Sequence, residues 1–127
     1  EVDQFATEGY LLVRDALEDE DLDPIIAEYE AFIDRRARAL FAEGKISDVH
    51  AGASFEHRLA LICRECSEIF PELDIMKLRA KAAFAFLRNE TLLDMVEAFV
   101  GSEITCSPIQ HIRAKVPQGE CQLWCPL

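Results

Sequence analysis

The clearest pattern in the chain is a stripe of apolar positions between residues 22 and 41. Apolar side chains recur there every three or four residues, at Leu22, Ile25, Ile26, Tyr29, Phe32, Ile33, Ala37, Leu40 and Phe41. This spacing places them on one face of an α-helix. The acidic residues 18–23 complement the positive end of a helix dipole, and Pro24 is tolerated within a first turn. The pattern therefore predicts a long amphipathic helix that ends near Gly44.

Two more helices are predicted in the middle of the chain. A polar loop over residues 45–53 precedes a helix over about 54–68, for which Ser54 is a possible N-cap. Pro71 ends this helix, since proline cannot continue one. The Ala-rich stretch 73–87 consists of good helix formers and predicts the next helix.

Glycines mark the ends of two further helical segments. Residues 2–8 predict a short helical turn that stops at Gly9. Residues 90–100 predict a helix with Asn89 as its N-cap and Gly101 at its end.

Three short stretches predict β-strands instead. The apolar run 10–13 suits a buried strand, and the β-branched residues in 104–106 and 109–116 favour two more, the last ended by Pro117. The order strand, four helices, strand, strand predicts an α+β fold with too few strands to complete a sheet.

The charge of the chain bounds its partners. Its 127 residues suit one domain, and 24 acidic against 13 basic residues give a net charge of −11. Such a chain repels phosphate backbones and anionic lipids, so we expect neither nucleic-acid nor membrane binding. No apolar run approaches the roughly 20 residues that span a bilayer, and no signal peptide is visible, so a cytoplasmic protein is expected. Because the chain begins at Glu1, an upstream targeting segment stays open.

Three segments of the chain resemble the N-terminal part of the phytanoyl-CoA dioxygenase family. They are Phe5–Val13 with its Gly9-Tyr10 pair, Thr91–Gly101, and His111–Pro117. The resemblance implies a double-stranded β-helix, or jelly roll, braced by N-terminal helices. Residues 1–127 would then form the N-terminal part of one such domain, with helices over about 19–101 and core strands from about 103.

The resemblance also implies an activity for the complete domain. Members of the family use Fe(II), 2-oxoglutarate and oxygen to hydroxylate a small organic molecule, and hold iron with two histidines and a carboxylate. Two of these ligands come from a Trp-His-x-Asp-like segment. Here Trp124 is followed by Cys125, Pro126 and Leu127, so a cysteine and a leucine stand about where the histidine and aspartate belong. We therefore expect no catalytic or metal-binding residue in this chain, no tight cofactor binding and no activity, as for an enzyme cut short.

One residue is a candidate contact for the cosubstrate. In relatives, inward side chains of the strand that His111 matches border the 2-oxoglutarate pocket, which makes His111 the candidate cofactor-binding residue; a histidine that only packs on a sheet is the alternative. Lys115 shares its strand face by the period of two and is expected to reach solvent.

Cysteines and the other histidines offer weaker candidates. Cys63 and Cys66, together with Cys121 and Cys125, could form a four-thiolate zinc site. Helical periodicity instead favours Cys63 and Cys66 as small apolar residues. His50 and His57 are seven positions apart, and the intervening glycine favours separate surface positions.

A different class of function stays open beside the dioxygenase. The chain could be a non-catalytic helical module that docks a partner through its first long helix. The sequence leaves the substrate and the oligomeric state undefined.

Overall fold

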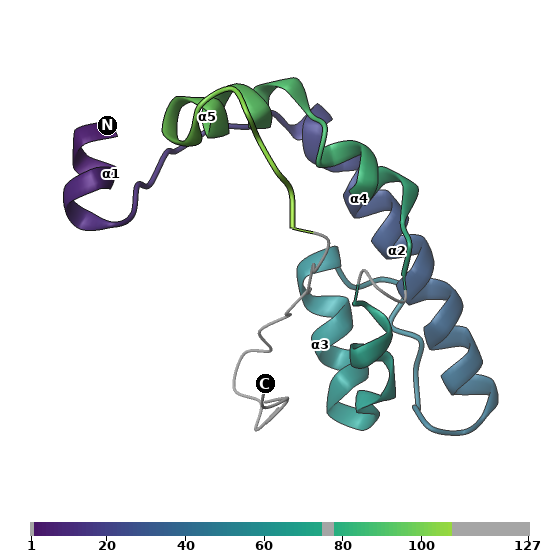
Figure 1. The fold of residues 1–127 in the computed structure, drawn as a ribbon. Helices are drawn as coiled ribbons and strands as arrows, with labels where there is room; N and C mark the ends of the chain where they lie inside the picture. Colours follow the sequence, from purple (N-terminus) through teal and green to yellow (C-terminus); the bar gives the residue numbers. More distant parts are fainter. Residues whose placement is uncertain (1, 75–77, 108–127) are drawn as a thin grey trace. The chain divides into compact units, whose positions relative to one another are not determined.

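The computed structural model describes residues 2–74 and 78–107, and every regular element in them is a helix (Figure 1). The elements in chain order are α1 (Val2–Glu8), α2 (Asp19–Ala42), α3 (Phe55–Glu65), the 3₁₀ helix η1 (Ser67–Glu72), α4 (Lys81–Phe86) and α5 (Glu90–Val100). The described residues divide into two compact units. Unit 1 comprises residues 2–28 and 79–107, and unit 2 comprises residues 29–74 and 78.

The predicted α+β class is wrong for the described part of the chain, which contains no β-strand and therefore no strand of a jelly roll. Residues 10–13 have no regular structure, and Tyr10, Leu12 and Val13 are exposed. Residues 104–106 also form no strand. Strands need partners to satisfy their backbone hydrogen bonds, and a short apolar run does not supply one. The predicted strand 109–116 lies outside the described residues.

The long amphipathic helix is confirmed. α2 begins at Asp19 and places Asp19, Glu20 and Asp21 in its first turn, as the acidic cluster predicted. Pro24 is the sixth residue of the helix, one turn later than expected. The start is fixed by the Asp21 carboxylate, which accepts the Glu18 N–H at 3.1 Å in one half of a capping box.

Gly44 ends α2 through a Schellman motif. Its φ is +71°, the Lys45 N–H donates to the Leu40 carbonyl at 2.9 Å, and the Gly44 N–H donates to the Phe41 carbonyl at 3.0 Å. This pair of bonds satisfies carbonyls that the end of a helix leaves open. The left-handed backbone is the reason that a glycine is required here.

Unit 2 contains nearly all of the buried apolar residues among those described. Nine of the eleven lie in it: Tyr29, Ile33, Ala37, Leu40, Ile46, Ala60, Ile62, Ile69 and Leu73. The α2 members follow the helical spacing of the predicted stripe. Leu40, Ile62 and Ile69 are fully buried, and each contributes about 1.5–3 kcal/mol through the hydrophobic effect. Within this unit, α2, α3 and η1 all contribute buried residues, α3 contacts η1, and polar side chains join α2 to both.

The middle helices differ from the prediction at their boundaries. α3 ends at Glu65 rather than at about residue 68, because Cys66 adopts an extended backbone with φ −147° and ψ 115°. Pro71 lies inside η1. The predicted helix over 73–87 is wrong at its start: among its described residues, 73–74 and 78–80 are not helical, and α4 spans Lys81–Phe86.

The late start of α4 follows from a capping contact within unit 1. The Glu28 carboxylate accepts the Lys81 N–H at 2.9 Å and the Ala82 N–H at 2.6 Å. These are two of the N–H groups that the first turn of a helix cannot pair internally. A carboxylate at this position also complements the helix dipole. This contact in the folded chain therefore sets the boundary, against the helix propensity of the preceding residues.

The predictions for α1 and α5 are confirmed, and the two helices touch within unit 1. Asn89 caps α5 by accepting the Leu92 N–H at 2.9 Å. Its Nδ2 donates to Asp21 at 2.6 Å. The rings of Phe5 on α1 and Phe99 on α5 lie 4.9 Å apart between centroids, a favourable aromatic contact.

The glycine that ends α2 provides a test of the backbone argument. Replacing Gly44 with alanine meets no atom within 4 Å, so its cost is that of the left-handed backbone, about 1–2 kcal/mol of unfolding free energy. The matched control is Gly52→Ala, which also meets no atom and whose φ lies outside the left-handed region. We expect this control to be neutral or stabilising by less than about 1 kcal/mol. Urea unfolding followed by the helical circular dichroism signal measures both. Equal effects of the two substitutions would contradict the assignment.

Candidate functional site

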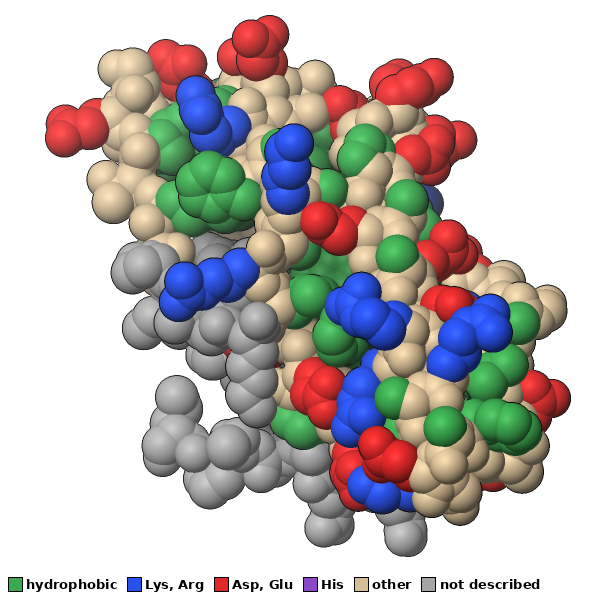
Figure 2. Space-filling model, turned by 90° about the vertical axis from the view of Figure 1, so that its right-hand side faces the viewer, with side chains coloured by type: hydrophobic (Ala, Val, Ile, Leu, Met, Phe, Trp, Pro, Cys, Tyr) green, Lys and Arg blue, Asp and Glu red, His purple; other side chains and the backbone are tan. Residues whose placement is uncertain are grey.

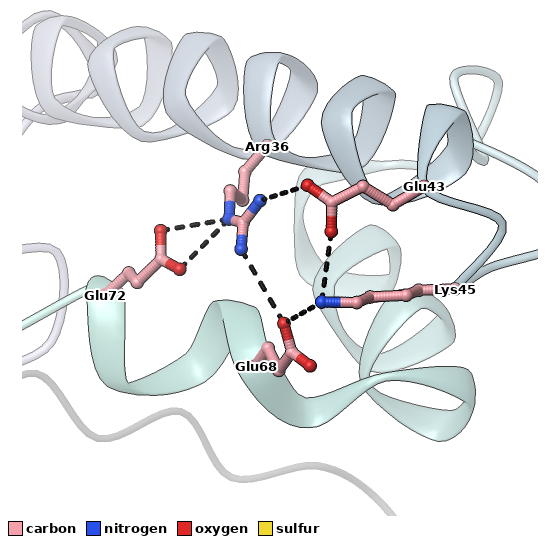
Figure 3. Close-up of polar contacts among 5 residues, drawn as sticks. All are labelled: Arg36, Glu43, Lys45, Glu68 and Glu72. Atoms are coloured by element: carbon pink, nitrogen blue, oxygen red, sulfur yellow. Dashed lines mark hydrogen bonds and ion pairs between the residues drawn. The ribbon is translucent and has the colours of Figure 1, made fainter.

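A cluster of five charged side chains lies in unit 2. This ion cluster consists of Arg36 and Glu43 on and just after α2, Lys45 in the following turn, and Glu68 and Glu72 on η1 (Figure 3). Arg36 Nε donates to both carboxylate oxygens of Glu72, at 3.0 and 3.1 Å. Lys45 Nζ lies 3.0 Å from Glu43 and 2.6 Å from Glu68. Weaker pairs at 3.9 Å join Arg36 to Glu43 and to Glu68.

Every charge in the ion cluster has a partner, which makes it a structural feature. The Lys45 ammonium lowers the pKa of Glu43, and Glu68 together with Glu43 raises the pKa of Lys45. Both side chains are largely solvated, so each pair stabilises the fold only weakly. The cluster joins η1 to the end of α2 and leaves no unpaired cation or anion for a ligand.

A second polar contact joins α3 to α2. Arg58 is 91% buried, and its Nη2 donates to Asp34 at 2.7 Å and to the Val49 carbonyl at 3.0 Å. Asp34 also accepts from Arg38 Nε at 2.8 Å. Hydrogen bonds from Arg38 and then Arg58 lower the pKa of Asp34 to about 2. The buried guanidinium is thus compensated by a carboxylate and a carbonyl, as a buried charge requires.

The two histidines in the described part make separate local contacts, as the sequence predicted. His50 Nε2 lies 3.3 Å from Glu65 Oε1, and the other Glu65 oxygen accepts the Ser47 N–H at 2.7 Å. Ser47, and to a lesser degree His50, lowers the pKa of Glu65. His57 Nδ1 instead pairs with Ser54 Oγ at 2.9 Å, so Ser54 precedes α3 without a side-chain cap. These contacts hold the 45–53 loop and the start of α3.

None of these groups forms a metal centre. Within residues 2–74 and 78–107, no three His, Cys, Asp or Glu side chains are grouped so that they could hold a metal ion. Cys63 and Cys66 are half-buried on α3 and at its C-terminal end, and two other members of the hypothetical zinc site, Cys121 and Cys125, lie outside the described residues. The residues that the structure describes therefore do not fit Fe(II) or Zn²⁺. The candidate cosubstrate residue, His111, also lies outside them, as does Lys115.

The feature that sequence reasoning missed is the exposed apolar segment 10–13. The short apolar run suggested burial, whereas Tyr10 and Leu12 are 64% and 70% exposed. A usable signal was present in the chain: charged residues stand close on both sides, at Glu8 and at Arg14-Asp15. Asp15 adopts a left-handed φ of 52°, a turn conformation that Asp tolerates better than most residues.

Comparison with models of known protein families, with curated proteins and with solved structures finds no match to this chain. Among the described residues, no helix is both long enough and apolar enough to cross a membrane.

The lowered pKa of Asp34 predicts how the fold responds to acid. Because the folded pKa of about 2 lies below the ordinary value of 3.8, the stabilisation by charged Asp34 is complete above about pH 4 and is lost as the pH falls through 2. An NMR titration of the Asp34 carboxyl should have its midpoint near 2.

Two arginine variants on α2 test whether the hydrogen bond from Arg38 lowers the pKa of Asp34. Arg38→Gln removes the larger contribution and should raise the Asp34 midpoint, while Arg35→Gln, whose guanidinium lies over the Phe32 ring, should leave it in place. A wild-type midpoint near 4, or equal shifts in both variants, would refute the proposed cause.

Proposed function

We propose that this chain is the non-catalytic, N-terminal helical region of an Fe(II)- and 2-oxoglutarate-dependent dioxygenase similar to the phytanoyl-CoA dioxygenases. The complete enzyme would hydroxylate a small organic molecule. The observation that carries the proposal is the order of the three segments that resemble this family, Phe5–Val13, Thr91–Gly101 and His111–Pro117.

The helical parts of the first two segments support the proposal. α1 and α5 each end at a glycine with positive φ: Gly9 donates to the Phe5 carbonyl at 2.8 Å, and Gly101 donates to the Glu97 carbonyl at 2.9 Å. Residues 10–13, which the resemblance implied to be a strand, have no regular structure and lend no support. The two helices, α1 and α5, are far apart in sequence and yet meet through their phenylalanine rings. Segments that resemble one family and also pack together favour a common origin over a chance match of apolar patterns.

The described residues supply no iron chemistry to this proposal. Their carboxylates serve as helix caps and ion-pair partners, and they are not gathered as a metal site. In the proposed enzyme, iron and 2-oxoglutarate would supply the oxidative chemistry, and residues outside the described part would hold them. The part described here would contribute folded helices to the enzyme and no catalytic step.

The alternative of a module that docks through its first long helix has less support. The centre of the α2 stripe, at Ile33, Ala37 and Leu40, is already buried inside unit 2. Only Phe41 of this stripe is strongly exposed. An apolar face that forms a core within its own chain is not free to bind a partner.

The coding DNA tests the family proposal directly. Reading through and beyond the codon for Leu127 in all three frames should reveal His-x-Asp within about ten codons and then a distal His, which complete the iron triad of such enzymes. An Arg soon after the distal His should follow, as the basic residue that the resemblance implies for the far carboxylate of 2-oxoglutarate. A stop codon without these motifs in any frame would refute the proposal.

An activity assay tests the non-catalytic part of the proposal. Purified 1–127, supplied with Fe(II) and 2-oxoglutarate, should release no oxygen-dependent succinate above the buffer rate. The control is the longer gene product, if the DNA encodes one, which should release succinate under the same conditions. Turnover by 1–127 alone would contradict the non-catalytic assignment.

A further inference from the structure

Unit 1 buries little apolar surface of its own. Of the eleven buried apolar residues, only Ala80 and Ala83 lie in it, and neither is large. α5 is an apolar helix with no buried residue at all. Seven of the eight large apolar side chains that are strongly exposed in the described part belong to unit 1: Val2, Phe5, Tyr10, Leu12, Val13, Phe84 and Val100. Large exposed apolar side chains that gather on one surface are typical of a docking site.

The charge of unit 1 indicates what covers it. Its described residues include thirteen acidic and four basic side chains, a difference of nine negative charges, whereas unit 2 has nine acidic and six basic ones, a difference of three. Figure 2 shows hydrophobic side chains reaching the surface, with basic and acidic side chains both close by. Charged groups around an interface select a partner of opposite charge and accelerate the encounter.

We propose that unit 1 docks a second protein through the Tyr10–Val13 segment and the half-buried face of α5, and that the partner surface has an apolar centre bordered by lysine and arginine. This inference does not rest on the dioxygenase proposal. A second copy of the chain fits less well, because two such units each have nine more acidic than basic residues and therefore repel each other.

A synthetic amphipathic helical peptide made of leucine and lysine is the probe. Titrated into 1–127 by calorimetry, it should bind at least about tenfold more tightly than a serine–lysine peptide of equal charge or a leucine–glutamate peptide of equal apolarity. Equal binding of the serine–lysine peptide would show attraction by charge alone and overturn the proposal.

Matched variants locate the binding surface. Leu12→Ser should weaken binding of the leucine–lysine peptide about tenfold, since a buried leucine side chain is lost from the interface. Phe41→Ser is the control: Phe41 is 51% exposed but lies in unit 2, so binding should change by less than about twofold. Both positions are exposed, and circular dichroism verifies that the helices persist. Equal weakening by the two variants would overturn the assignment to unit 1.

Two further outcomes concern other occupants. Free 1–127 should sediment as a monomer, and a dimer that Leu12→Ser dissociates would make a second copy the occupant and refute the proposal. The same peptide titration applies to any longer product of the gene. Loss of peptide binding in that product would show that its own additional residues cover unit 1, which also refutes docking of a second protein.

Discussion

The burial of one face of α2 is the constraint on which unit 2 depends. Ile33, Ala37 and Leu40 recur at helical spacing and are almost fully removed from water. Burial of this face within unit 2 stabilises α2 beyond its helix propensity, which alone stabilises an isolated helix only marginally. The ion cluster and the Arg58–Asp34 pair restrict how these helices are oriented, because polar contacts form only at a particular alignment of the helices.

In unit 1, hydrogen bonds to carboxylates position the helices, whereas in unit 2 buried apolar contacts do so. Asp21 accepts from both the Glu18 backbone and the Asn89 side chain, and Glu28 accepts from the first turn of α4. Such bonds orient helix ends, but a typical hydrogen bond contributes only about 1 kcal/mol net, because the groups also bind water when unfolded. The contact between the exposed Phe5 ring and the half-buried Phe99 ring adds some apolar stabilisation. Unit 1 is thus specified by polar contacts and lacks a large buried core.

The sequence predicted the elements whose signals are local. Asn89 and Gly101 bound α5 as expected, and Gly44 ends α2, because a cap acceptor and a positive φ are properties of single residues. The sequence-based prediction failed for elements whose boundaries or pairing depend on residues distant in the chain. The start of α4 is set by Glu28, more than fifty positions earlier, and the run 10–13 forms no strand because pairing needs a partner strand.

The candidate site was less predictable for the same reason. A histidine or cysteine pattern indicates possible ligands, but the neighbours decide the role: Glu65 receives Ser47 and His50 in a loop contact, and Ser54 pairs with His57. Cys66 stands where α3 gives way to extended backbone. These histidine, serine and glutamate side chains therefore already serve as hydrogen-bond partners within the fold. What the described part leaves exposed is a set of large apolar side chains in unit 1, the unit with the larger excess of acidic residues.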